Sequence, residues 1–392
     1  MAELQMTCHC GNVKHALTGA ADASDIELCH CYGCRHSTGQ LYASYYEVDR
    51  DSTLPLLASP ALSRYDSAGP QRGDSGGAAR DAATALYFCS TCGCHVFRTT
   101  AGPEETRVEV ATGTLTDGNE LSAAKFASHA RADETRDGGL TKWLVELPIS
   151  KHAEKSVRHY SSAKLVHKAL RPHDTLDASC LCGGVALRIT RPNASSLEPC
   201  SGFADMIIPF HTGDPDIKNP ADVKWWLRES GTKYMAGLCA CQTCRLVSGF
   251  ELQSWAFVPR TNIEYRARVD GHADDGWKVL DFEALRATGT LRGYESSPGV
   301  MREFCGGCGA TVFWHDRWRP ELIDVSAGLL QDDDGEGDGV RAEGWLSWWM
   351  DRVSFAEDVV LGRHGVPRER ARWLVESIEK NMRTEGGRKQ GG

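Results

Sequence analysis

A cluster of three cysteines followed by an arginine occurs twice in the chain at the same spacing. Residues 28–39 read LCHCYGCRHSTG, and residues 238–249 read LCACQTCRLVSG. Cysteines separated by only one or two residues are too close for ordinary structural disulfides, but they are well placed to bind one metal ion together. Such ligand clusters constrain the fold strongly, because the backbone between the cysteines must wrap around one metal ion.

The rest of the cysteine pattern repeats in the same order. The first copy has TCHCGNV at 7–13 and FCSTCGCHVF at 88–97, and the second has SCLCGGV at 179–185 and FCGGCGATVFW at 304–314. Each copy thus holds cysteines in a 2 + 3 + 2 arrangement, and the two copies account for all but Cys94 and Cys200 of the 16 cysteines. An internal repeat of this length indicates two related domains.

Both copies are expected to be mainly β, because stretches such as NVKHALTG and GVALRITR alternate apolar and polar residues. A C-terminal helix is expected at 366–384, with Pro367 near its start and Trp373, Leu374 and Ile378 along one side. The predicted organisation is a first domain at 1–150, a polar linker at 151–172, a second domain at 173–362 with an insert at about 190–236, and a C-terminal helix with a disordered tail at 363–392.

Composition disfavours several classes of function. The net charge of −9 argues against a nucleic-acid partner, since phosphate binding needs clustered Lys and Arg. No apolar run is long enough to span a membrane, and the N-terminus MAELQMTCHCGNVK lacks the basic and apolar regions of a secretory signal. We therefore expect a cytoplasmic protein without a membrane partner. The sequence leaves its oligomeric state open.

Thiolate ligands at these spacings favour Zn²⁺, which prefers four tetrahedral ligands. The first and last cysteine pairs of each copy supply four sulfurs, enough to close one structural zinc site. We therefore predict two such sites, one formed by Cys8, Cys10, Cys89 and Cys92, and the other by Cys180, Cys182, Cys305 and Cys308.

The middle clusters supply only three sulfurs each, from Cys29, Cys31 and Cys34, and from Cys239, Cys241 and Cys244. Three protein ligands and an open position are typical of a zinc ion that binds water or substrate. The alternative is that a fourth ligand closes each site: His36, Cys94 or His95 in the first copy, and Cys200 in the second. Otherwise Cys94 and Cys200 are expected to be small buried residues.

The combined motif Cys-x-Cys-Gly, Cys-x-Cys-x-x-Cys-Arg-x-x-Ser/Thr-Gly and Phe-Cys-x-x-Cys-Gly resembles the glutathione-dependent formaldehyde-activating enzyme family. The same domain occurs in centromere protein V, and the tandem arrangement resembles a fungal subgroup. The resemblance covers about 5–148 and, less continuously, 175–350. It implies a β-tent fold, up to two zinc ions per repeat, and carbon–sulfur lyase activity that condenses glutathione and formaldehyde to S-hydroxymethylglutathione.

The resemblance also suggests residue roles. It implies that the middle clusters, Cys29, Cys31, Cys34, Cys239, Cys241 and Cys244, bind the catalytic zinc. Arg35 and Arg245 follow these clusters and either hold a carboxylate of glutathione or form structural salt bridges. Gly39 and Gly249 are expected to provide a backbone turn, and His129 to be a structural histidine. Tryptophans follow the last motif of each copy, at Trp143 and at Trp345, Trp348 and Trp349.

The favoured function is a zinc-dependent carbon–sulfur lyase-type enzyme that acts on glutathione with formaldehyde, or with a larger aldehyde or glutathione conjugate. Trp225 and Trp226 in the insert favour the larger substrate, and the second copy is favoured as the active one. The alternative is a non-catalytic zinc scaffold that binds a protein partner. A zinc deaminase is excluded because no His-x-Glu precedes a Pro-Cys-x-x-Cys.

Overall fold

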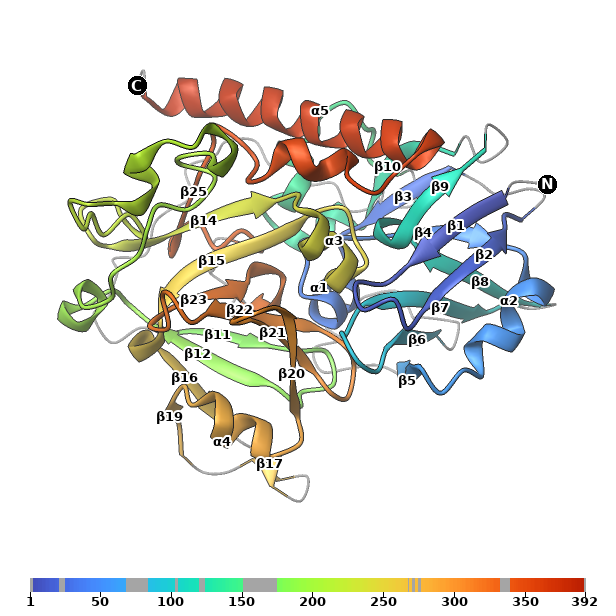
Figure 1. Cartoon of the computed structure of the whole chain (residues 1–392), viewed down its shortest axis with the longest axis horizontal. Coiled ribbons are helices and arrows are strands. Elements are labelled where there is room, and N and C mark those ends of the chain that lie inside the picture. Colours follow the sequence, from blue (N-terminus) through green and yellow to red (C-terminus); the bar gives the residue numbers. More distant parts are fainter. Residues whose placement is uncertain are drawn as a thin grey trace.

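The computed structural model shows a mainly β protein in two halves with a helix across them (Figure 1). It describes residues 3–20, 25–67, 84–102, 105–119, 124–150, 175–266, 268–269, 272–273, 276–331 and 339–390. We call residues 3–150 the first half and residues 175–362 the second half. The predicted linker at 151–172 lies outside the described residues.

The first half consists of two sheets, with strand orders β2-β1-β9 and β10-β3-β4-β8-β7-β6-β5. Burial alternates along β1, so that Leu4 and Met6 face the core, as the sequence periodicity predicts for a half-buried strand. The elements are β1 (Glu3–Thr7), β2 (Lys14–Thr18), β3 (Ile26–Cys29), α1 (Tyr32–Thr38), β4 (Ala43–Val48), α2 (Arg50–Leu57), β5 (Leu62–Ser67), β6 (Thr84–Cys89), β7 (His95–Ala101), β8 (Thr106–Ala111), the 3-10 turn η1 (Thr112–Thr114), β9 (Leu115–Gly118) and β10 (Phe126–Ala130).

The second half has the sheets β19-β16-β12-β11-β24 and β13-β14-β15-β23-β22-β21-β20, with β25 paired to β14, and a small ladder β17-β18. Its elements are β11 (Thr175–Ser179), β12 (Ala186–Thr190), β13 (Leu227–Arg228), β14 (Lys233–Cys239), α3 (Gln242–Ser248), β15 (Gln253–Pro259), β16 (Ile263–Arg266), β17 (Arg268–Val269), β18 (His272–Ala273), β19 (Lys278–Val279), α4 (Phe282–Ala287), β20 (Leu291–Ser297), β21 (Val300–Cys305), β22 (Thr311–Asp316), β23 (Leu322–Ser326), the 3-10 turn η10 (Ala327–Leu329), β24 (Leu330–Gln331) and β25 (Leu346–Trp348).

The two halves share one topology. The order β3-β4-β8-β7-β6-β5 of the first half corresponds to β14-β15-β23-β22-β21-β20 of the second. A strand from late in each half also pairs in parallel with the matching strand, because β10 pairs with β3 and β25 pairs with β14. The sequence repeat is therefore a structural repeat, and residues of the two halves can be matched strand by strand.

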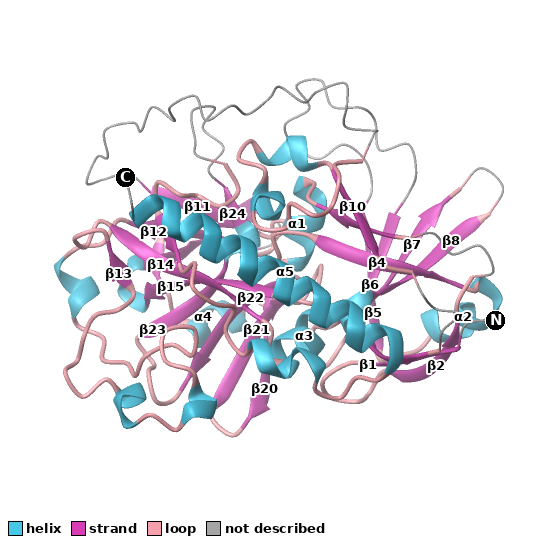
Figure 2. Ribbon diagram, turned by 90° about the horizontal axis from the view of Figure 1, so that it is seen from above, coloured by secondary structure: helices cyan, strands magenta, loops and turns pink. Residues whose placement is uncertain are grey.

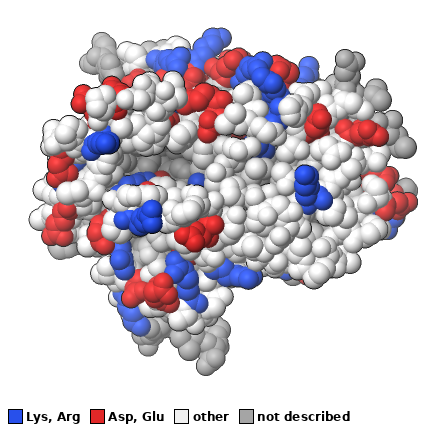
Figure 3. All heavy atoms as spheres, in the orientation of Figure 1, with Lys and Arg blue, Asp and Glu red and all other residues white. Residues whose placement is uncertain are grey.

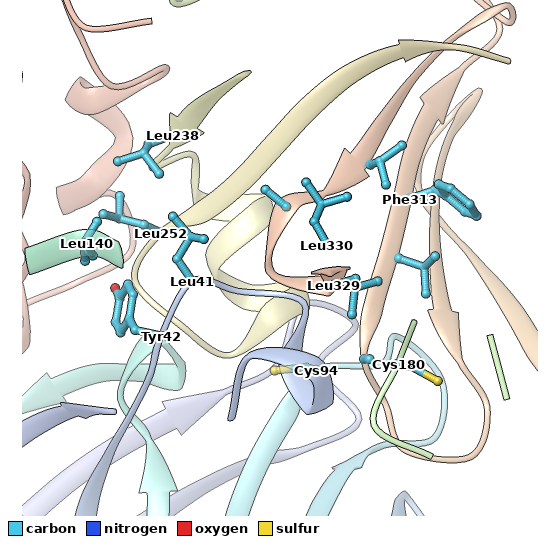
Figure 4. Packing of buried hydrophobic residues seen from close by; sticks show 14 of the residues in the cluster. Leu41, Tyr42, Cys94, Leu140, Cys180, Leu238, Leu252, Phe313, Leu329 and Leu330 are labelled. Atoms are coloured by element: carbon cyan, nitrogen blue, oxygen red, sulfur yellow. The ribbon is translucent and has the colours of Figure 1, made fainter. Parts of the chain in front are cut away.

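The halves meet through backbone contacts that are themselves repeated. Gly113 in η1 donates its N–H to Gly249 O at 2.9 Å, and Gly328 in η10 donates to Gly39 O at 3.2 Å. Hydrophobic packing continues across this contact. Figure 4 shows Leu41 and Tyr42 of the first half beside Leu252 of the second, within one buried cluster. The two halves therefore share a single core.

The C-terminal helix α5 (Gly365–Gln390) lies across both halves (Figure 2). Arg370 Nη1 donates to Ala124 O of the first half at 3.1 Å, and Glu379 Oε1 accepts from Val353 N of the second half at 2.9 Å. Leu374 and Ile378 are buried as expected, whereas Trp373 is 38% exposed and lies at the edge of the packed face. No helix among the described residues is long and apolar enough to cross a membrane.

The expectation of a disordered tail from residue 385 is wrong as far as Gln390, because α5 continues to that residue. Tertiary contacts explain the longer helix. Glu385 pairs with Lys142 Nζ of the first half at 2.8 Å, and Gly386 packs against the side chain of Met350. These contacts offset the low helix propensity of Gly386 and Gly387.

Replacing either interface glycine tests this contact. A Cβ on Gly113 would lie 2.5 Å from Phe250 N, and one on Gly328 would overlap the carbonyl oxygen of Gln40. We expect Gly113→Ala and Gly328→Ala each to lower the free energy of unfolding by about 2–4 kcal/mol, because backbone atoms cannot move aside as side chains do. Chemical denaturation measures this loss.

The matched control is Gly276→Ala, where an added Cβ would meet no atom within 4 Å. Its unfolding free energy should stay within about 0.5 kcal/mol of the unmodified protein. Equal stability of all three variants would contradict the close approach of the two halves.

Candidate metal centres

The structure brings the repeated cysteines together in four groups, and the sulfurs of each group lie within 4.8 Å of one another. Every cysteine of the chain is a free thiol, so no disulfide competes with metal binding. The groups are Cys8, Cys10, Cys89 and Cys92; Cys180, Cys182, Cys305 and Cys308; Cys29, Cys31 and Cys34; and Cys239, Cys241 and Cys244.

The two four-cysteine groups have the dimensions of a tetrahedral thiolate site. Cys10 Sγ lies 3.5 Å from both Cys8 Sγ and Cys89 Sγ, and Cys182 Sγ lies 3.4 Å from Cys305 Sγ. Zinc–sulfur bonds of about 2.3 Å place tetrahedral ligands about 3.8 Å apart, close to these separations. The donor set therefore fits a closed Zn²⁺ site in each half.

Each three-cysteine group is formed at the junction between a strand and a short helix. Cys29 ends β3, and Cys31 caps α1 by accepting the N–H of Cys34 at 3.3 Å. In the second half Cys239 ends β14, and Cys241 accepts the N–H of Cys244 at 3.2 Å. The local fold therefore gathers all three ligands without any distant residue.

A cation is needed if these thiols are to ionise together. Hydrogen bonds to Cys241 and Cys244, together with burial, hold the pKa of the Cys239 thiol well above its ordinary value. Several buried thiolates without a counter-ion would repel one another in this apolar setting. A bound Zn²⁺ removes that penalty, and the sulfur ligands are of the type that zinc prefers.

Within the described part of the chain, no fourth Cys, His, Asp or Glu joins either three-cysteine group. His36 Nδ1 donates to Ser179 O at 2.7 Å, and Cys94 is buried and donates to His95 O. Cys200 is exposed beside Asp222, so the expectation that it is buried is wrong. The described residues thus provide the donor set of an open zinc site with three protein ligands.

Two arginines that follow the clusters are buried inside the fold. Arg245 Nη1 donates to Gly113 O at 2.6 Å, and its Nη2 donates to Leu361 O at 3.1 Å. Arg35 Nε donates to His30 O at 3.3 Å. These hydrogen bonds to carbonyls give Arg245 a structural role between the halves and give the carboxylate-binding interpretation no support.

The other expected structural residues behave as such. His129 Nε2 donates to Leu144 O at 2.9 Å, and its Nδ1 lies 2.9 Å from His30 Nε2. Gly39 and Gly249 end the two short helices with φ of 79° and 88°, a conformation that favours glycine. Both glycines also make the close contact between the halves described above.

The two three-cysteine groups have different surroundings. In the first half Cys34 packs beside Tyr45 and Phe250, and Phe250 comes from the second half. The second group belongs to a larger set that we call the aromatic cluster, formed by Met206, Trp225, Trp226, Met235, Cys239, Cys244, Trp255, Phe257 and Leu322. On the face seen in Figure 3, the surface is hollowed over the second half, and basic side chains lie beside the hollow.

Sequence reasoning missed a charged neighbour of the second group. Arg302 in β21 donates from Nη1 to Cys244 Sγ at 3.2 Å and is 5% exposed. The strand pairings make Leu86 its counterpart in the first half, since Leu86 pairs with Arg98 as Arg302 pairs with Trp314. The sequence did contain a signal for this neighbour. The second copy has an arginine three residues before Cys305, where the first copy has a leucine three residues before Cys89.

Metal analysis of cysteine variants tests the four-cysteine sites. We expect Cys308→Ser to lose about one zinc per chain and to be destabilised by several kcal/mol, because metal binding contributes directly to the stability of such sites. Elemental analysis and thermal unfolding measure the two effects. Cys200→Ser, which changes a cysteine outside all four groups, should retain full metal content. Full zinc content in Cys308→Ser would contradict this assignment.

Comparison with known proteins agrees with the cysteine pattern. Residues 3–129 match the family model of the glutathione-dependent formaldehyde-activating enzyme. The matched residues include the first three-cysteine group and all strands of the first half except the end of β10. No curated protein matches the chain. Residues 3–129 of the chain are therefore similar to the glutathione-dependent formaldehyde-activating enzyme family.

Proposed function

We propose that the protein is a zinc-dependent carbon–sulfur lyase-type enzyme that condenses glutathione with formaldehyde or a larger aldehyde. The observation that carries this proposal is the contrast between two closed four-cysteine groups and two groups with only three protein ligands among the described residues. Closed sites stabilise a fold, whereas a zinc with an open position can bind a reacting molecule.

In the proposed reaction the thiol sulfur of glutathione adds to the aldehyde carbon. A carbon–sulfur bond forms, the carbonyl π bond breaks, and the thiol proton ends on the new hydroxyl oxygen. Cys239, Cys241 and Cys244, or their counterparts in the first half, would hold the zinc ion, whose positive charge would keep a thiol ionised near neutral pH. We place this chemistry in the cytoplasm, where free thiols persist.

The chain's own residues support the reaction by positioning. The N–H of Cys244 donates to Cys241 Sγ and orients this ligand, and Arg302 does the same for Cys244. The aromatic cluster packs against the same cysteines and excludes water from one side of the group. Holding thiol and aldehyde together in this way converts a bimolecular addition into an intramolecular one.

Two features favour the second half as the active one. It alone has the Arg302 contact, and its insert places Trp225 and Trp226 in the aromatic cluster with Cys239 and Cys244. These tryptophans are held by the fold, because Trp225 Nε1 donates to Gly202 O and Trp226 Nε1 donates to Ser196 O. Trp225 and Trp226 are themselves buried, but Trp349 packs half-buried against the same cluster and is the side chain suited to contact an aldehyde larger than formaldehyde.

Single cysteine variants test both the activity and the active half. We expect Cys241→Ser to lower the catalysed condensation of glutathione and formaldehyde by roughly 100-fold, because the open site is lost, and Cys31→Ser to change it little. Exchange spectroscopy measures the rate above the uncatalysed background, and elemental analysis of each variant gives its zinc content.

Cys200→Ser is the control for a general effect of losing a cysteine. Equal losses in Cys31→Ser and Cys241→Ser would refute the preference for the second half. Catalysis no faster than background in the fully zinc-loaded protein would refute the enzyme and support a zinc scaffold that binds a protein partner.

A substrate panel tests the size of the aldehyde. Trp349 is half-buried against the aromatic cluster, whereas Trp318 is 63% exposed and outside it. We expect Trp349→Ala to lower kcat/KM for a bulky aromatic aldehyde by roughly 10-fold while sparing formaldehyde, since lost aromatic contacts cost about 1–2 kcal/mol. Trp318→Ala should change neither substrate. If the enzyme turned over formaldehyde and no larger aldehyde, the proposal of a larger substrate would be refuted.

A further inference from the structure

A row of side chains crosses the main sheet of the second half beside the three-cysteine group. Tyr294 in β20 pairs with Arg302 in β21, Arg302 pairs with Trp314 in β22, Trp314 pairs with Asp324 in β23, and Asp324 pairs with Phe257 in β15. Directly paired residues of neighbouring strands share one face of a sheet. The row therefore lies along one face of the sheet, with Arg302, Asp324 and Phe257 buried. Its link to the metal centre is the contact between Arg302 and Cys244.

Arg302 has hydrogen-bonding capacity that the fold leaves unused. Its Nη1 binds Cys244 Sγ, but its Nε is buried without a hydrogen-bond partner among the described residues. A buried guanidinium N–H without a partner costs free energy that a bound anion would recover.

A second guanidinium lies on the same tryptophan. The Arg319 guanidinium carbon is 4.4 Å from the centre of the Trp314 ring, and that of Arg302 is 5.9 Å from it. Arg319 Nη2 binds Asp324 Oδ1 at 2.7 Å, but Arg319 Nη1 is buried without a partner in the part of the chain that the structure describes. Two arginines thus approach one indole, and each keeps an unused donor.

The charges of this row do not balance. Asp324 is the carboxyl group of the row, and burial raises its pKa to about 7 in spite of Arg319 and Arg302. Near neutral pH the Asp324 carboxyl group is therefore only partly ionised, so its negative charge does not balance the positive charges of Arg302 and Arg319. Three thiolates holding a Zn²⁺ ion would leave one net negative charge, which Arg302 would offset. The charge of Arg319 is then balanced only by the partly ionised Asp324.

The first half lacks this arrangement. The matching row is Tyr65, Leu86, Arg98, Glu109 and Glu47. Its arginine is held by both oxygens of one carboxylate, since Arg98 Nε and Nη2 donate to Glu109 at 2.7 and 2.6 Å. A bidentate pair of this kind satisfies the fork of the guanidinium. The first row therefore offers no comparable cationic surface.

We propose that Arg302 and Arg319 form a carboxylate-binding subsite next to the second three-cysteine group, so that the second half selects thiols carrying an acidic group near the sulfur. This rests on the proposed function, in which a substrate thiol takes the open position. That thiol would lie about 3.8 Å from Cys244 Sγ in a tetrahedral site. Arg302 is then within reach of a carboxylate on the same small molecule, such as the glycyl carboxylate of glutathione.

Ligand binding to the full-length, cobalt-loaded protein tests the subsite. Cobalt replaces zinc as a visible probe, and a thiol joining the open position changes its absorption. We compare glutathione with its diethyl ester, which keeps the thiol and removes both negative charges. We expect the ester to bind roughly 10–100-fold more weakly, the range of a charge-assisted hydrogen bond of about 1.5–3 kcal/mol.

Arginine variants assign this preference to the subsite. Arg302→Met and Arg319→Met should each reduce the difference between glutathione and the ester to less than about 3-fold, that is, below about 0.7 kcal/mol. Arg302→Lys keeps the charge and provides a second variant if Arg302→Met fails to load metal. The matched control is Arg317→Met, which removes an exposed arginine close in sequence to Arg319 and should leave the preference unchanged.

The outcomes separate the two proposals. If glutathione and the ester bind equally well, or if the preference survives in both arginine variants, the carboxylate subsite is wrong while the proposed function stands. If neither thiol changes the cobalt spectrum, the proposed function fails, and the subsite fails with it.

Discussion

Backbone-to-backbone contact between the halves is the constraint on which the metal centres depend. Helix α3 carries Cys244 and ends at Gly249, whose carbonyl accepts the N–H of Gly113 from the other half. Helix α1 carries Cys34 and ends at Gly39, which contacts Gly328 in the same way. Each three-cysteine group is therefore positioned partly by the half that does not contain it, as in a symmetric dimer whose two subunits are joined in one chain.

Buried charges next to this contact reinforce it. Arg363 pairs with Glu251 at 2.5 Å, and both side chains are fully buried between α3 and α5. Arg245 donates to Gly113 from the same region, and Arg363, Arg370 and Arg245 together hold the pKa of Glu251 below its ordinary value although burial opposes this. Breaking such a pair is costly, because the remaining charge stays buried, so these groups require one specific arrangement of the two halves.

The sequence was sufficient for features that depend on local spacing. The three-cysteine groups follow from ligand spacing, and the strands and most of α5 follow from the periodicity of apolar residues. The four-cysteine groups join distant pairs, but they could be predicted because Zn²⁺ requires four ligands. Distant contacts that no such chemical requirement signals were not predicted. The contact between Arg302 and Cys244 spans 58 positions, and α5 extends to Gln390 because Glu385 meets Lys142 of the first half.

The sequence also did not predict that the two halves share one core. Two similar motifs suggest two independent domains, yet residues of both halves and of α5 form one buried cluster. Nothing in the pattern of either repeat distinguishes a residue that packs within its own half from one that packs on the other. The surroundings of the two three-cysteine groups diverge for the same reason, since Phe250 reaches the first group from the second half.

The position of α5 has a consequence for how the protein is made. Strand β9 of the first half packs against α5, although the whole second half separates them in sequence. Ribosomes add about 5–20 residues per second, so roughly 10–50 s pass between the synthesis of β9 and that of its covering helix. During this time the first half has neither α5 nor its contacts with the second half. The first half therefore reaches its final packing only after α5 has been synthesised.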